Sequence, residues 1–568
     1  MIDMKFNDII RSNRKLENSR IENPYKIAVI SNIMVHQIKD ILEYSLRTEG
    51  IYTDVKIGDY DNIVQDSMNF KDKNSVIIFW ELSNIVDNLQ WKVEQFDDVK
   101  YQQIINKVKQ EIDIVLNNLK STPLIIFNLF SSLVFRKTSL RDSKFSLMAD
   151  ELNSYLLSLN KNNLRFINID KTISLISINK SIDLRYYLSS KTLYKTDFYK
   201  SYIEHIKPIF LSLNGKTKKA LILDCDNTLW KGVLGEDGFD KIKIFQEIQY
   251  MALDLSKNGV IIGLCSKNNQ EDVDNVIKNH KSMILRDDDI IIKKVNWNDK
   301  VSNLKAISKE LNIGLDSMVF VDDSDFEINL VRENLPTIST YQISKSEYLH
   351  TNMVESIKNE FYQNSLTYED KKKKDMYKAQ IQRVEAEKDI GNIEDYLKSL
   401  DLIINVYIDD KSLVSRLSQM TQKTNQFNLT TKRYSETEIS TFIEDNNLIV
   451  IGIGVKDKFG DNGIVGLSIL NIENNIAEID TLLMSCRVLG RNIEYKFMDI
   501  IIFILKNKKI NICKAKYVKT YKNAQVADLF DGYEFDKDLY SETESNYKLD
   551  IDKYQSKNFN YIGVEYGK

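Results

Sequence analysis

A short apolar run that ends in two aspartates constrains this chain more than any other stretch. Residues 220–223 read ALIL, and Asp224, Cys225 and Asp226 follow them. An apolar run of this kind predicts a buried parallel strand, and open α/β sheets bind ligands at the carboxyl ends of such strands. Because side chains alternate along a strand, we expect Asp224 and Asp226 to point to one side and Cys225 to the other.

Two carboxylates held this close repel each other unless a cation lies between them or one of them is protonated. A hard divalent ion meets this requirement, and Mg²⁺ takes oxygen ligands and commonly binds a phosphate as well. The pattern therefore predicts a magnesium site. The alternative interpretation is a solvated turn, because Asp-rich segments also end strands without binding a metal.

Three later segments supply the polar groups that phosphoryl transfer needs. Residues 259–266 predict a second strand that ends in a hydroxyl, and residues 317–323 predict a third strand that ends in two carboxylates. Between them a lysine opens an amphipathic helix over residues 300–311, which Asn312 and Gly314 are expected to close. This order of strands and helices predicts a doubly wound sheet with the polar tips at one edge. The polar residues are Ser266, Lys267, Asn268, Lys300, Asp322 and Asp323.

On these four motifs, residues 220–335 resemble the haloacid dehalogenase (HAD) phosphatase superfamily. The resemblance implies that Asp224 is the nucleophile that accepts the phosphoryl group and that Asp226 is the general acid and base. It also implies that Ser266 holds the phosphoryl oxygens and that Lys300 neutralises charge in the transition state. By the same resemblance, Mg²⁺ is held by Asp224, Asp226, Asp322 and Asp323, and the substrate is contacted by Thr228, Lys267 and Asn268.

The wording of the motifs is similar in more detail to the FkbH-like family, whose members supply glyceryl units to polyketide and related assembly lines. The matching segments are DNTLWKGVLGEDG, CSKNN, VNWNDK, ELNIGLDSMVFVDD and VRENLP. Family members more often carry Asn-Pro after the last aspartate pair, where this chain has Ser324 and Asp325. That difference concerns the shape of a loop rather than a ligand.

A chain of 568 residues is too long for one hydrophobic core, so we expect several domains. Residues 1–215 alternate apolar runs with helical stretches, which predicts an α/β layered domain, and they resemble the SGNH-hydrolase-like domain of the FkbH-like family. Ser31 stands where the nucleophile of such a hydrolase would lie, but His205 lacks the spacing of its histidine partner. We therefore expect a docking or substrate-shaping module here, followed by the HAD-like domain over residues 216–365.

Two regions follow the HAD-like domain. Residues 366–400 are highly charged with widely spaced apolar positions, so we expect a solvated helical connector. Residues 401–568 alternate strands and helices again, and they resemble the α+β fold of GNAT-type acyltransferases. Within them the polar stretch TQKTNQFNLTTKRY (421–434) predicts either a loop that orients a ligand or a hydrogen-bonded turn.

The segment SCRVLGRN joins a predicted strand to a predicted helix. Its residues Arg487, Gly490 and Arg491 precede the helix N-terminus, an arrangement typical of an anion site because free N–H groups and the helix dipole face the loop. The segment resembles the pyrophosphate loop of GNAT-type acyltransferases. Asn492 replaces a later small residue of that pattern, which argues against ordinary acetyl-CoA binding.

The FkbH-like resemblance spans essentially the whole chain and implies a complete reaction. In that family 1,3-bisphosphoglycerate is captured, freed of its phosphates and delivered as a glyceryl thioester to the phosphopantetheine arm of an acyl carrier protein. If the acyl group rests on the enzyme, a thiol is the expected carrier. Cys486 precedes the anion loop and is preferred to Cys225, which alternation turns away from the metal. For both, a small buried hydrophobe is the alternative.

Two other functions stay open. One is a stand-alone Mg²⁺-dependent phosphatase for a small phosphomonoester, with flanking domains that only bind. The other is an assembly scaffold whose HAD-like domain is vestigial.

The bulk composition excludes several classes of partner. A net charge of −4 provides no basic surplus to neutralise phosphates, which argues against a general nucleic-acid binder. No apolar run reaches the length of a membrane span and the first residues lack a signal-peptide core, so we expect a cytoplasmic protein without a membrane partner. The four cysteines are widely spaced with no CxxC pair, which predicts neither a disulfide framework nor a zinc site.

Overall fold

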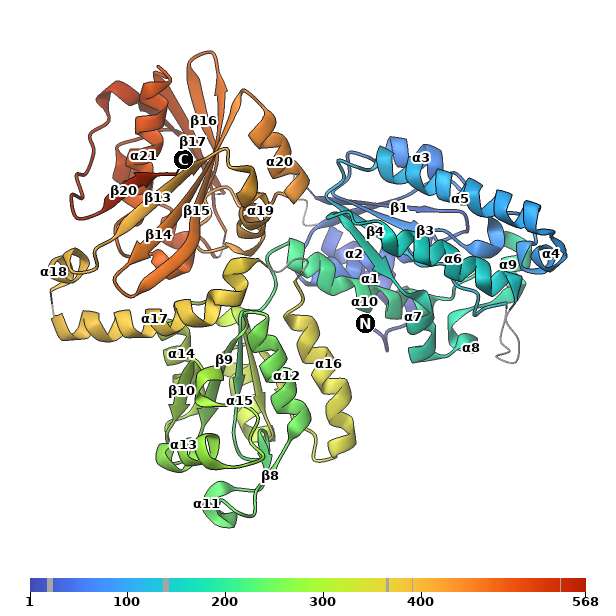
Figure 1. Cartoon of the computed structure of the whole chain (residues 1–568), viewed down its shortest axis with the longest axis horizontal. Coiled ribbons are helices and arrows are strands. Elements are labelled where there is room, and N and C mark those ends of the chain that lie inside the picture. Colours follow the sequence, from blue (N-terminus) through green and yellow to red (C-terminus); the bar gives the residue numbers. More distant parts are fainter. Residues whose placement is uncertain are drawn as a thin grey trace. The chain divides into compact units, whose positions relative to one another are not determined.

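The computed structural model describes residues 1–17, 24–135, 143–363, 367–390, 392–520, 522–541 and 543–567 (Figure 1). The chain forms two compact units. One consists of Met1–Phe210 with Tyr434–Ile439, and the other of Leu211–Arg433 with Ser440–Lys568. The expected domain boundary between residues 365 and 366 lies outside the described residues.

The first unit is built on a five-stranded parallel sheet in the order β2-β1-β3-β4-β5. Its central strands are buried along their whole length, as expected when helices cover both faces. Apolar side chains of α5 and α6 pack on one face, and α1, α2 and α10 lie on the other side (Figure 1). The strands are β1 Tyr25–Ser31, β2 Thr53–Ile57, β3 Ser75–Phe79, β4 Leu124–Asn128 and β5 Leu164–Ile167. The helices are α1 Phe6–Glu17, α2 Ile38–Thr48, α3 Ile63–Asn69, α4 Leu89–Lys92, α5 Asp98–Asn118, α6 Lys144–Ser158, α7 Ile169–Ile176, α8 Ile178–Ser181, α9 Leu184–Ser190 and α10 Thr196–Leu213.

The second unit begins with another parallel sheet, in the order β10-β9-β6-β11-β12. One apolar core joins the sheet to α12, α13 and α16, and a second core joins the opposite face to α14 and α15. The predicted doubly wound arrangement is therefore confirmed. The strands are β6 Ala220–Leu223, β9 Ile261–Ser266, β10 Ile292–Val295, β11 Met318–Asp322 and β12 Ser339–Gln342. The helices are α12 Gln246–Lys257, α13 Gln270–Asn279, α14 Lys300–Leu311, α15 Asp325–Asn334 and α16 His350–Glu360.

Local sequence fixes the bounds of α14, which carries the predicted catalytic lysine as its first residue. The Asp299 carboxylate accepts a hydrogen bond from the Ser302 backbone N–H at 2.8 Å and so caps the helix start. Asn312 closes the helix in the left-handed conformation with a φ of 50°. The helix predicted over residues 300–311 is thus confirmed. A small hairpin of β7 Trp230–Lys231 and β8 Lys243–Ile244, with α11 Leu234–Asp237 between its strands, interrupts the chain between β6 and α12.

The rest of the second unit is an eight-stranded mixed sheet in the order β18-β19-β17-β16-β15-β14-β13-β20. β16 and β17 pair only along Ile476–Ile479, and the segment Phe427–Leu429 hydrogen-bonds to both strands beyond that point. The strands are β13 Ile403–Ile408, β14 Leu448–Asp457, β15 Gly460–Glu473, β16 Ile476–Met484, β17 Ile512–Val518, β18 Asp536–Tyr540, β19 Glu544–Asp550 and β20 Gly563–Tyr566. The helices are α18 Ile393–Lys398, α19 Val414–Lys423, α20 Glu436–Glu444 and α21 Ile493–Asn507. Two parallel sheets and one mixed sheet confirm the expected multi-domain α/β class.

The charged connector is a helix, α17 Tyr368–Ile390, but it is not solvated all round. Met376, Tyr377 and Arg383 are buried. The Arg383 guanidinium forms two 2.8 Å hydrogen bonds to Asp457 on β14, and those two side chains are 2% and 0% exposed. The expectation of a solvated connector is therefore wrong for this face, because apolar packing of Tyr377 and Ile381 and the ion pair of Arg383 together attach the helix. Among the described helices, none has the length and apolar character needed to cross a lipid bilayer.

Replacing Asp457 by alanine tests this attachment. Asp457 also accepts a contact from Arg491 at 3.2 Å, so Asp457→Ala leaves two buried guanidinium groups without their carboxylate. We expect a loss of about 3–5 kcal/mol in unfolding free energy, seen as a lower midpoint in thermal unfolding by circular dichroism. Glu478→Ala, which removes an exposed carboxylate on β16, is the matched control. Equal unfolding midpoints for the two variants would show that the Asp457 ion pairs do not stabilise the attachment of α17.

Candidate active site

Three adjacent strands, β9, β6 and β11, bring the predicted polar residues together at the carboxyl ends of the parallel sheet in the second unit. Asp224 follows β6 directly, Ser266 is the last residue of β9, and Asp322 is the last residue of β11. β6 lies between β9 and β11, and the chain continues to β10 on one side and to β12 on the other. The site therefore occupies the point where the strand order reverses, which is where open α/β sheets bind ligands.

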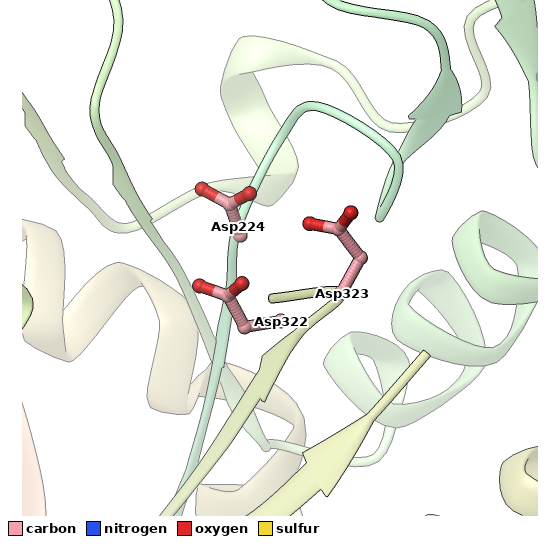
Figure 2. A group of neighbouring side chains, drawn as sticks. All are labelled: Asp224, Asp322 and Asp323. Atoms are coloured by element: carbon pink, nitrogen blue, oxygen red, sulfur yellow. The ribbon is translucent and has the colours of Figure 1, made fainter. Parts of the chain in front are cut away.

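Three carboxylates gather at this edge: those of Asp224, Asp322 and Asp323 (Figure 2). One oxygen from each lies within 4.8 Å of the other two. Burial raises the pKa of both Asp322 and Asp323, and the negative charge of Asp224 raises them further. Such a group of hard oxygen donors fits Mg²⁺, which would relieve their mutual repulsion.

Lys300 is the buried cation of the site. Its ammonium donates to Asp224 Oδ1 at 2.5 Å and to the Cys265 carbonyl at 2.7 Å, and it lies 3.1 Å from Asp322 Oδ2. Burial alone would lower the pKa of Lys300, but the charges of Asp224 and Asp322 outweigh burial and raise it above its usual value. The lysine is therefore held charged, and one positive charge faces three carboxylates.

Asp226 lies outside the group of three carboxylates, although the expected set of metal-binding side chains includes it. Its Oδ1 accepts hydrogen bonds from Trp230 Nε1 at 2.9 Å and from the Leu234 N–H at 3.1 Å, and its Oδ2 accepts one from Asn268 Nδ2 at 2.8 Å. The reason is that β6 ends at Leu223, so strand alternation no longer sets the direction of residue 226. Burial raises the pKa of Asp226. Three N–H donors thus occupy both oxygens of Asp226 and fix its carboxylate near Asp224, whose charge acts on it.

The other side chains that were expected to contact the substrate differ in how far partners within the protein already engage them. Asn268 holds Asp226, and the Lys267 ammonium pairs with Glu327 Oε1 at 2.6 Å. Thr228 is fully buried, and within the described structure its hydroxyl has no hydrogen-bond partner. Ser266 is buried beside the Cys225 thiol. The residues of the four predicted motifs thus come together, with Lys267 and Asn268 in contact with Glu327 and Asp226.

The two candidate thiols lie in different environments. Cys225 is fully buried, and burial together with the charge of Asp224 raises its thiol pKa well above the usual range. A thiol in that state is a poor nucleophile. Cys486 lies instead in the wall of a pocket in the second unit, beside Arg487. The geometry favours Cys486 of the two.

The predicted anion loop before α21 is only partly available to a ligand. Arg491 is buried, and its guanidinium donates to Gln380 Oε1 at 2.7 Å, to the Arg487 carbonyl at 2.6 Å and to Asp457 at 3.2 Å. Gly490 is exposed with a φ of 79°. The chain's own acceptors thus engage three N–H donors of Arg491, which favours a structural role over the binding role expected for it.

The hydrolase residues considered for the first unit do not assemble. Ser31 Oγ accepts the Ile33 backbone N–H at 3.1 Å, whereas His205 Nδ1 contacts Thr172 Oγ1 at 2.9 Å. His205 is partly buried, and that burial lowers its pKa. These contacts agree with the expectation that His205 is not the base of an esterase.

Sequence reasoning missed a second group of polar residues. Lys373, Arg416 and Lys423 line the same pocket as Cys486. For Lys373 and Lys423 the signal was present in the lysine run of α17 and in the stretch 421–434, but a lysine run is usually solvated and the burial of this one depends on tertiary packing. Residues 423–427 line the pocket and Phe427–Leu429 hydrogen-bonds to the sheet, so the predicted stretch contains both a hydrogen-bonded segment and part of a pocket wall. Its first three residues, 421–423, are the end of helix α19.

Comparison with known proteins shows similarity in structure but not in sequence. No family model matches the chain, and no curated protein matches it. Among solved structures, the N-terminal part of the protein BF1531 from Bacteroides fragilis, which contains a phosphatase domain and was crystallised with Mg, aligns with a TM-score of 0.56 at 22% identity. The alignment covers 64% of this chain and 100% of that one. At this identity the likeness shows a shared fold.

Acetyltransferases align with a smaller part of the chain. The ribosomal-protein-S18-alanine N-acetyltransferase from Escherichia coli has a TM-score of 0.22 at 9% identity over 28% of this chain and 98% of its own. Mutant forms of the spermidine/spermine N-acetyltransferase SpeG from Vibrio cholerae have a TM-score of 0.22 at 12% identity over 27% of this chain and 95% of their own. These scores are too low to carry an argument about the chain.

Two matched substitutions test the set of metal-binding side chains. Asp323→Asn removes a carboxylate of the group, so we expect Mg²⁺ affinity to fall by about tenfold or more in isothermal titration calorimetry. Asp226→Asn leaves the group intact and should change the affinity by less than about threefold. A larger loss in Asp226→Asn than in Asp323→Asn would place Asp226 in the metal-binding set.

Proposed function

We propose that this protein is a Mg²⁺-dependent phosphatase of the HAD type that also transfers a glyceryl group to an acyl carrier protein. The observation that carries the phosphatase part is the buried group of Asp224, Asp322 and Asp323 with Lys300 in contact with two of its members. The HAD-like motifs and the fold shared with a phosphatase-containing structure support it. A cytoplasmic location is part of the same proposal.

Asp224 and Asp226 have different roles in the cleavage of a phosphomonoester. An Asp224 carboxylate oxygen attacks phosphorus, the bond from phosphorus to the ester oxygen breaks, and Asp226 gives that oxygen its proton. Burial favours the protonated form of Asp226 that this step needs. Water then attacks the phosphorus of the aspartyl phosphate while Asp226 takes a proton from it, and the bond to Asp224 breaks to release phosphate.

Charge compensation is the second requirement of this chemistry. Asp224, Asp322 and Asp323 would hold Mg²⁺, which when bound supplies Lewis-acid stabilisation of the phosphoryl oxygens. Lys300 provides a fixed positive charge in a buried setting, where electrostatic stabilisation is strong. Trp230, Leu234 and Asn268 position Asp226 through its three hydrogen bonds.

The glyceryl part of the proposal concerns 1,3-bisphosphoglycerate. Its acyl phosphate is already activated, so the Cys486 thiolate can attack the carbonyl carbon and expel phosphate without a nucleotide. The phosphopantetheine thiolate of the carrier then attacks the thioester, and Cys486 leaves. The remaining 3-phosphate is a monoester and is the substrate of the Asp224 site. What supports this part is the resemblance of the motifs and the position of Cys486 in a pocket wall.

Incubation with 1,3-bisphosphoglycerate and a phosphopantetheinylated carrier protein tests the function as a whole. We expect intact-mass analysis to show a glyceryl adduct on the carrier and an assay to show release of phosphate. Asp224→Asn should reduce phosphomonoester hydrolysis by about a thousandfold or more, because no nucleophile remains. Asp325→Asn, at an exposed position at the start of α15, is the control. Full phosphate release with an unmodified carrier would leave only the stand-alone phosphatase, and unchanged hydrolysis in Asp224→Asn would indicate a scaffold.

The thiol assignment is tested separately. Cys486→Ala should abolish transfer of the glyceryl group to the carrier while hydrolysis of 3-phosphoglycerate stays within about twofold of wild type, because the two steps use different residues. Cys513→Ala, which removes a fully buried thiol on β17, is the matched control. Undiminished carrier loading by Cys486→Ala would rule out an acyl intermediate on this residue.

A further inference from the structure

A small pocket in the second unit gathers more positive than negative charge. It is bordered by α17, by α19 with the loop that follows it, and by the turn before α21, and it has a volume of about 60 Å³. Among the described residues, none of the carboxylate group at the end of β6 and β11 lines it, so the two sites are separate. The charged residues of its wall are the cations Lys219, Lys373, Arg416, Lys423 and Arg487 and the carboxylates Glu369 and Asp370.

The two carboxylates do not neutralise these cations. Asp370 accepts from the Lys423 ammonium at 3.1 Å and from the Thr367 backbone N–H at 3.1 Å, and it lies 3.7 Å from the Lys373 ammonium. Glu369 lies 3.8 Å from the Arg416 guanidinium. One carboxylate is thus shared by two lysines, and a surplus of positive charge faces the cavity.

Arg487 has an unused donor at this pocket. The residue is 5% exposed, and within the described structure its buried Nε has no hydrogen-bond partner. One of its terminal nitrogens lies 3.2 Å from the thioether sulfur of Met376, which is a weak acceptor. A buried guanidinium N–H without an acceptor is costly, and an anion in the cavity would satisfy it.

The lysines show the same lack of counter-charge. Burial lowers the pKa of Lys373 to about 8 and that of Lys423 to about 7, although Asp370 opposes both shifts. Repulsion by Arg487 adds to the shift of Lys373, and repulsion by Lys373 adds to that of Lys423. Binding of an anion would relieve both effects.

We propose that this pocket binds the phosphate group of a small molecule. Its volume of about 60 Å³ leaves room for a group of a few non-hydrogen atoms, and one phosphate group is of that size. The arginine fork and the lysine point charges are the groups that proteins use for phosphate. The inference rests on the charges of the pocket wall and not on the carboxylate site. Cys486, which the proposed transfer uses, lines the same pocket, so the phosphate group bound here would belong to that transfer if the proposed function is correct.

Calorimetric titration of the full chain with inorganic phosphate tests the site. The titration is made in EDTA, so that without divalent cations the carboxylate group at β6 and β11 repels the probe. Wild type should show saturable binding, and Lys373→Gln and Arg487→Gln should each weaken it by about tenfold or more. Lys374→Gln is the matched control, because Lys374 is the next residue of α17 and pairs with Asp289 at 3.2 Å, outside the pocket. Thermal unfolding of each variant shows whether it remains folded.

Two further probes identify the source of the phosphate group. Tighter binding of 3-phosphoglycerate than of free phosphate indicates a small phosphorylated acid, and tighter binding of phosphopantetheine indicates the arm of a carrier. Either result supports the site. Absence of saturable binding of all three probes to wild type would overturn it, as would an equal loss in Lys374→Gln, which would reveal a general effect of surface charge. A protein that binds phosphate here but loads no carrier would retain this inference and lose the proposed transfer.

Discussion

The contact of Lys300 with Asp224 and Asp322 is the interaction on which the proposed phosphatase chemistry at the sheet of β6, β9 and β11 depends. Three carboxylates lie together at the end of a buried sheet, and their mutual repulsion would disfavour the fold without a nearby cation. Lys300 supplies one positive charge from the first turn of α14, where Asp299 caps the helix and so fixes the position of the lysine. One ammonium does not balance three carboxylates, and the remaining negative charge would favour a divalent cation at this site.

The strands that form this site were predictable because they are central and apolar. Residues 220–223, 259–266 and 317–323 each gave a buried run, and β6, β9 and β11 lie within or close to these bounds. The edge strands β10 and β12 were not predicted. Each is only four residues long and contains lysines or polar side chains, because an edge strand has one side open to solvent and needs no continuous apolar run.

The sequence predicted which residues form the site, but it did not predict the direction of every side chain. The motif pattern placed Asp224, Lys300, Asp322 and Asp323 together, and the structure brings them into contact. Alternation failed for Asp226, because the strand ends three residues earlier and Asn227 then turns the chain with a φ of 51°. The alternation of side chains applies only as long as the backbone stays in the extended strand conformation.

The C-terminal region shows the opposite case, in which polar residues form the interior. Arg383, Asp457 and Arg491 are buried as an ion-paired group, and Lys373 and Arg487 face a pocket that no apolar periodicity reveals. The sequence pattern predicted a solvated helix for Lys373 and Arg383 and an anion-binding loop for Arg487 and Arg491. Their partners lie far apart in the sequence, so only tertiary structure could identify them.

The most direct test of the account is a search for the covalent intermediate. Wild-type protein is mixed with Mg²⁺ and a phosphomonoester, quenched in acid within one turnover, digested and examined by mass spectrometry. The account predicts a peptide that contains Asp224 and is heavier by one phosphoryl group, with the added mass on that residue. Phosphate release at the full rate with the phosphoryl group on another residue, or on none under conditions that trap acyl phosphates, would contradict it.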